Sequence, residues 1–127
     1  MSANLNNWPR LLSLAEGEVT DVLQGLAPAL RKQAERVTVI YERKPSRKLI
    51  ADGNEEDTLG LFVGSDYAEE LHAAPVPQQI ILYLENIWDM AEGDEEFFLE
   101  DVRDTLLHEL GHYLGLDEDD LTNRGLD

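Results

Sequence analysis

Two histidines and a glutamate near the end of the sequence have the spacing of a metal site. His108, Glu109 and His112 form the pattern H-E-x-x-H. Residues four positions apart lie on the same face of an α-helix, so the two imidazoles can bind one metal ion. Glu109 is then placed to take a proton from a water bound to that ion. The pattern predicts a zinc-dependent hydrolase, with peptides as the expected substrates and Glu109 as the general base.

An acidic stretch after the motif can supply a third zinc ligand. Gly115 is suited to end a helix, and Glu118 comes ten residues after His108, where longer versions of the motif carry their third ligand. We therefore expect Glu118 to bind the metal. Asp117 or Asp119 would replace it if the turn differed by one residue. Three protein ligands leave the fourth position of a tetrahedral zinc ion for water.

The motif lies on a segment whose apolar residues repeat with helical spacing. Leu106, Leu110 and Tyr113 belong to a face directed to a core, and the two histidines lie on the opposite, polar side. Residues 94–96 are acidic, which favours the N-terminus of a helix. Asp104, one turn before the first histidine, is a candidate acceptor that would orient an imidazole.

Three other residues of the sequence have side chains suited to chemistry. Tyr67 and Tyr83 are candidates for stabilising an oxyanion, and the sequence does not choose between them. His72 is expected to be a surface histidine and not a ligand.

Three short segments have the composition of β-strands that would hold the helix. They are residues 37–41, 59–64 and 80–84. Residues 8–36 have helical spacing of apolar residues, with Gly17, Gly25 and Pro28 as expected breaks or kinks. Residues 44–57 are polar and are expected to form an exposed loop. The predicted order is a helix, two strands, a loop, a third strand and the helix that carries the motif.

These segments resemble the small bacterial zincin-like metallopeptidase family. The resemblance is carried by residues 102–115 and the acidic stretch after them, with support from residues 59–64 and 80–83. It implies an α+β minimal zincin fold, with a mixed sheet of three to four strands above the active helix. Residues 1–127 are expected to form this single domain.

The resemblance also implies the roles of the site residues. His108, His112 and, by position, Glu118 would bind zinc, and Glu109 would be the general base. The family usually carries Asp at the third position, and the longer Glu would change how that ligand reaches the metal. Zincin substrates lie along the edge strand above the active helix. Residues 79–84 are therefore either a docking edge for strand addition or an interior strand.

Composition narrows the expected partners. The chain has 127 residues, a net charge of −17 and no cysteine. The negative charge argues against binding to nucleic acid or to anionic membranes. The first residues lack an export signal and no run is long enough to cross a bilayer, so a cytoplasmic protein is expected.

Two functions are compatible with these features. The first is a zinc peptidase of limited substrate range that acts on peptides or proteins. The second is a catalytically weak metal-binding protein of the same fold, which holds a peptide or partner. Glu109 favours the peptidase, because a structural zinc site needs no general base. The short sequence after Glu118, which has no Met-containing turn, predicts an open half-cleft and favours the binding protein.

Overall fold

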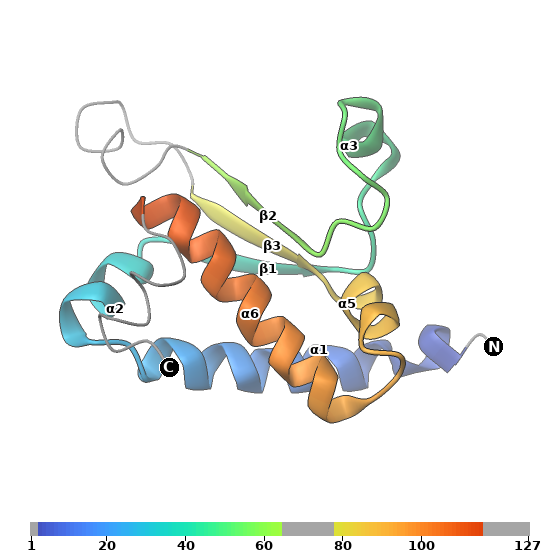
Figure 1. Cartoon of the computed structure of the whole chain (residues 1–127), viewed down its shortest axis with the longest axis horizontal. Coiled ribbons are helices and arrows are strands. Elements are labelled where there is room, and N and C mark those ends of the chain that lie inside the picture. Colours follow the sequence, from blue (N-terminus) through green and yellow to red (C-terminus); the bar gives the residue numbers. More distant parts are fainter. Residues whose placement is uncertain (1–2, 65–77, 116–127) are drawn as a thin grey trace.

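The computed structural model describes residues 3–64 and 78–115, with side chains from Asn7 onward in the first range. The elements in chain order are α1 (Ala3–Gln24), α2 (Pro28–Ala34), β1 (Thr38–Glu42), α3 (Arg47–Ala51), β2 (Gly60–Val63), β3 (Gln79–Tyr83), α5 (Leu84–Met90) and α6 (Glu95–Leu114). Figure 1 shows α1, α2 and α6 on one side of the sheet. The structure confirms the predicted α+β class.

The sheet is mixed and has the strand order β1-β3-β2. β1 runs parallel to β3 and β2 runs antiparallel to it. Ile81 lies between Ile40 of β1 and Leu61 of β2, which fixes the register of all three strands. β3 is therefore an interior strand, bonded on both sides. The docking-edge alternative for residues 79–84 is wrong, because both edges of this strand are already paired.

α1 is a long amphipathic helix beneath the sheet. Leu11, Ala15 and Val19 are buried along its inner face, at the helical spacing predicted from the sequence. Gly17 causes no break, since the helix continues through it to Gln24. The helix ends instead just before Gly25. Pro28 then lies in the first turn of α2, where its missing N–H costs no hydrogen bond.

α6 begins and ends where the sequence predicts. The Asp94 carboxylate accepts a hydrogen bond of 3.0 Å from the Phe97 N–H, which caps the first turn. Gly115 ends the helix in the left-handed conformation at φ 71°, with its N–H bonded to the Gly111 carbonyl. Five of its apolar side chains are buried against α1, α5 and the sheet: Phe98, Val102, Leu106, Leu110 and Tyr113.

Two short helices were not predicted from the sequence. α3 lies inside residues 44–57, which were expected to form a loop, and Ser46 caps it by accepting a hydrogen bond from the Leu49 N–H. α5 follows β3 directly, so Leu84 begins a helix and does not end a strand. Five and seven residues make too little of a repeat for helical periodicity to show in a sequence. Within the described ranges, no helix is long and apolar enough to span a membrane.

Candidate metal and catalytic site

The three residues of the H-E-x-x-H motif meet near the C-terminal end of α6. His108 and His112 are both exposed, and their ring centroids lie 4.6 Å apart. Nδ1 of His112 lies 3.4 Å from Oε1 of Glu109. One nitrogen or oxygen atom of each of the three residues lies within 4.8 Å of the others. The helix thus brings the side chains of His108, Glu109 and His112 together, as their spacing in the sequence predicts.

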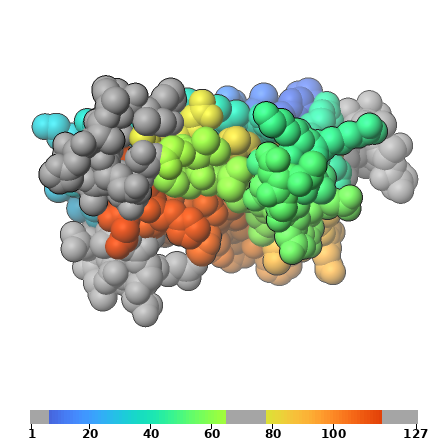
Figure 2. All heavy atoms as spheres, turned by 90° about the horizontal axis from the view of Figure 1, so that it is seen from above, coloured from blue at the N-terminus to red at the C-terminus, as the bar shows by residue number. Residues whose placement is uncertain are grey.

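Glu109 is much more deeply buried than the two histidines of the motif. The residue is 6% exposed, whereas the His112 side chain is 56% exposed. Its neighbour one turn earlier, Thr105, is also buried, at 8% exposure. Both residues lie on the side of α6 that packs on β2, and Figure 2 shows α6 directly alongside that strand. The strand therefore covers the carboxylate side of the motif, while the imidazoles stay open to solvent.

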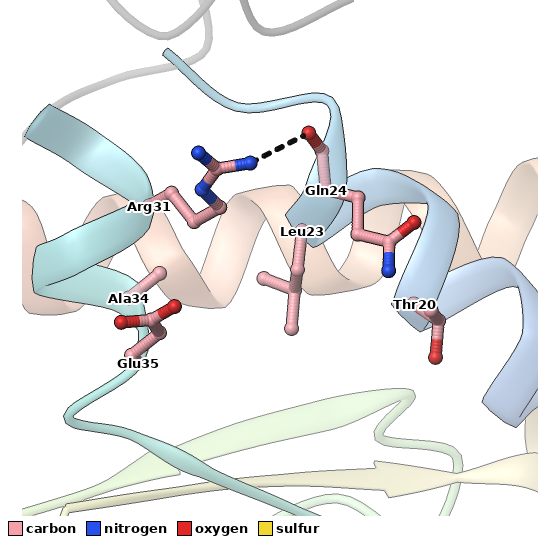
Figure 3. A pocket seen from close by; sticks show the side chains of 6 residues that line it. All are labelled: Thr20, Leu23, Gln24, Arg31, Ala34 and Glu35. Atoms are coloured by element: carbon pink, nitrogen blue, oxygen red, sulfur yellow. Dashed lines mark hydrogen bonds between the residues drawn. The ribbon is translucent and has the colours of Figure 1, made fainter. Parts of the chain in front are cut away.

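A cavity of about 290 Å³ lies between the start of β2 and α6. Its walls are Leu59, Gly60, Asp104, Thr105, His108 and Glu109. Leu59 also lines a larger hollow of about 620 Å³, which is bordered by α5 and the polar segment before β2. The two hollows are therefore neighbours, with Leu59 in the wall of each. A third hollow, of about 220 Å³, lies between α1 and α2, where Arg31 donates a 3.4 Å hydrogen bond to the Gln24 carbonyl (Figure 3).

The donor atoms fit a zinc ion in kind and in spacing. Zinc takes imidazole nitrogen and carboxylate oxygen at about 2.0–2.2 Å, so donors of one tetrahedral ion lie about 3.3 Å apart. The separations within the His108, Glu109 and His112 group are at most 4.8 Å. A short adjustment of exposed imidazoles therefore suffices to bring their nitrogens to a common ion. The two imidazoles could therefore hold a metal ion at this end of α6.

The sequence predicted the position of one of the titratable groups near the motif and not that of another. Asp104 lines the cavity, as expected for a residue one turn before His108. Burial, and then the charge of Asp104, raise the pKa of Asp101. Tyr83 is 1% exposed, and burial followed by the charge of Glu42 raises the pKa of its hydroxyl. Tyr83 does not line the cavity, so the structure does not support it as the oxyanion partner.

Several predicted residues lie outside the described ranges. These are Tyr67, His72, Asp117, Glu118 and Asp119. The third ligand therefore stays a prediction. Two residues that matter were missed by sequence reasoning, namely Gly60 and Thr105, which form the wall beside Glu109. A glycine inside a strand pattern is the signal that marks a close approach of backbone, and it was available in the sequence.

Comparison with known families agrees with this arrangement. Residues 34–126 match the zincin-like metallopeptidase family, and this match covers most of the chain. The chain belongs to the zincin-like metallopeptidase family. Its helices and three-stranded mixed sheet are a minimal zincin fold. No curated protein gives a significant match to the chain.

Proposed function

We propose that the protein is a zinc-dependent peptidase. His108 and His112 bind the metal with Glu118 as the third ligand, and Glu109 is the general base. The observation that supports this most is that His108, Glu109 and His112 each have a nitrogen or oxygen atom within 4.8 Å of the others, and that His108 and Glu109 line a cavity, in a chain of the zincin-like metallopeptidase family. A bound zinc ion supplies Lewis acidity that lowers the pKa of water and polarises a carbonyl.

The burial of Glu109 beside the cavity supports its proposed role in proton transfer. Its carboxylate is buried beside β2 and faces the cavity close to His112, so few positions are open to it. From there it accepts a proton from the attacking water and passes that proton to the leaving amine. A positioned acid–base group of this kind typically contributes about 10²–10⁴-fold to the rate.

The outer edge of β2 is the proposed docking edge for the peptide. The Tyr83 N–H donates a 2.9 Å hydrogen bond to the Leu59 carbonyl, so the main-chain groups of Leu59 point toward β3. Main-chain groups alternate in direction along an antiparallel pair, and Gly60 and Phe62 therefore direct theirs away from β3. No described strand pairs with that outer edge. An extended peptide can add there by main-chain hydrogen bonds, beside the cavity at His108.

Zinc content and peptide cleavage, measured together, test this function. Wild type, Glu109→Gln and the control Glu100→Gln are purified, loaded with zinc and assayed on a peptide library. Glu100 is an exposed acid on the same helix that does not line the cavity, so the control makes the same chemical change away from the site. All three proteins should bind one zinc ion. Turnover should fall about 10²–10⁴-fold in Glu109→Gln only.

Two outcomes would contradict the proposal, and they point to different corrections. Wild type that binds zinc but cleaves no peptide would support the alternative, a catalytically weak metal-binding protein that holds a peptide or partner. Wild type that takes up no zinc would show that the two imidazoles of α6 do not form a metal site.

A further inference from the structure

Gly60 of β2 lies directly against Thr105 and Glu109 of α6. We propose that Gly60 and Thr105 are positioning residues that hold the Glu109 side chain against β2. The space left by the missing side chain at position 60 then sets where the carboxylate lies. This inference rests on the proposed function, because it gives that function the elements that place its general base.

The first step is that position 60 has no room for a side chain. A Cβ atom built on Gly60 would lie 2.6 Å from Cγ2 of Thr105 and 3.3 Å from the carbonyl oxygen of Ile81. Contacts of Cβ atoms below 3.0 Å are essentially not observed, so one of the partners would have to move. The Ile81 carbonyl belongs to the central strand, which is bonded on both sides and cannot withdraw easily.

The requirement for glycine comes from this contact and not from the backbone conformation. The described glycines with positive φ are Gly53, Gly64, Gly93 and Gly115, and Gly60 is not one of them. An added Cβ at Gly17 or Gly53 would meet no atom within 4 Å. Any residue could adopt the backbone of Gly60, and it is the surface of α6 that excludes a larger one.

The second step links this contact to the general base. The same added Cβ would lie 3.4 Å from Cγ of Glu109, at the limit of ordinary contact. Thr105 lies one helical turn before Glu109, on the same face, and both are buried against β2. Thr105 is β-branched and has two favoured rotamers in a helix, so its methyl group has a single alternative position. A side chain at position 60 would therefore push β2 away from α6 and remove the wall behind Glu109.

The third step is that the metal ligands are affected less than the base. The three atoms nearest the added Cβ belong to Thr105, Ile81 and Glu109, and neither histidine is among them. His108 and His112 are exposed on α6 and need no support from β2. A change at position 60 should thus lower kcat while zinc stays bound, which a general loss of folding would not do.

The proposal is tested by removing the Thr105 methyl group, which a Cβ added at position 60 would contact. Gly60→Ala, Thr105→Ser and the double variant are compared with wild type for kcat, KM and zinc content. Gly60→Ala should lower kcat about 10–100-fold with one zinc still bound, because small displacements of a catalytic group have costs of this size. Thr105→Ser lacks Cγ2 and leaves the space for the new Cβ. The double variant should therefore recover kcat to within about tenfold of wild type.

Gly17→Ala is the matched control, because the same substitution there enters open space on α1. It should leave kcat unchanged. Wild-type kcat in Gly60→Ala, or a loss that Thr105→Ser does not restore, would overturn the proposal. If Gly60→Ala does not fold, the double variant decides alone, since the proposal requires it to fold and to turn over.

A second measurement separates this proposal from the proposed function. The carboxyl ¹³C NMR signal of Glu109, recorded with zinc present, needs no turnover. It should move in Gly60→Ala and return in the double variant. If wild type cleaves nothing, the peptidase function is wrong, and the NMR signal still decides whether Gly60 positions Glu109. An unchanged signal in Gly60→Ala would overturn the positioning role.

Discussion

The two sides of α6 are built on different principles. The side that faces α1, α5 and β3 is apolar and fully buried, with Phe98, Val102 and Leu106 at 0% exposure. The side that faces β2 buries two polar residues, Thr105 and Glu109, against a glycine. Apolar burial stabilises a fold, whereas burial of polar groups costs free energy unless they find partners. One side of the helix thus supplies apolar burial, and the other holds a carboxylate at the cavity wall.

This difference explains how a small domain can carry an open site. The imidazoles of His108 and His112 lie outside both contacts, on the exposed surface of α6. Their spacing is fixed by the helix, and the helix is fixed by its apolar side. The proposed metal ligands therefore do not need a buried cage, and of the three residues His108, Glu109 and His112 it is Glu109 that is buried.

Truncation on the apolar side of α6 and on its exposed imidazole surface should give the largest contrast. Leu106→Ala removes a fully buried side chain and should lower the free energy of unfolding by about 2–5 kcal/mol, since the cavity left behind is only partly refilled. His108→Ala, on the exposed side, should change it by less than about 0.5 kcal/mol in zinc-free buffer. Urea unfolding of both variants with a chelator present measures the two values. Equal losses would show that the exposed surface of α6 contributes as much to stability as its apolar side.

The sequence predicted α6 and its motif well because both depend on local spacing. The acidic start, the apolar repeat and Gly115 all lie within one segment, and the structure places them as expected. The same holds for the three strands, whose positions differ from the predicted ones by a residue or two. Local patterns of side chains are sufficient to find elements of this kind.

Features that depend on contacts between distant segments were not settled by the sequence. Whether residues 79–84 formed an edge or an interior strand depends on pairing with β1 and β2, which no local pattern specifies. Gly60 gave no sign of its partner, because Thr105 lies forty-five residues away in the chain. The burial of Glu109 follows from the same contact between β2 and α6. The grouping of the three side chains was therefore predictable, and the burial of Glu109 against β2 was not.

The cap at the start of α6 supports both sides of the helix equally. Asp94→Ala removes the carboxylate that accepts the Phe97 N–H at 3.0 Å, and it should lower the free energy of unfolding by about 1 kcal/mol. Asp94→Asn keeps an acceptor and should recover most of this loss. Denaturant unfolding of both variants measures the effect. A loss as large in Asp94→Asn would assign the effect to charge near the helix N-terminus and not to the cap.

The smallest effect is expected at the ion pair between α1 and α6. Arg10 donates two hydrogen bonds to Glu95, from Nε at 3.0 Å and from Nη2 at 2.8 Å. The side chains are 59% and 47% exposed, so water and salt weaken their attraction.

A double-mutant cycle with Arg10→Ala and Glu95→Ala should therefore give a coupling energy of about 0.2–1 kcal/mol at low salt. This coupling should shrink further at about 1 M salt, where charges are screened within a few ångströms. Unfolding at both salt concentrations measures it. A coupling above about 2 kcal/mol that salt does not change would mean that this polar contact, and not the apolar side alone, holds α1 to α6.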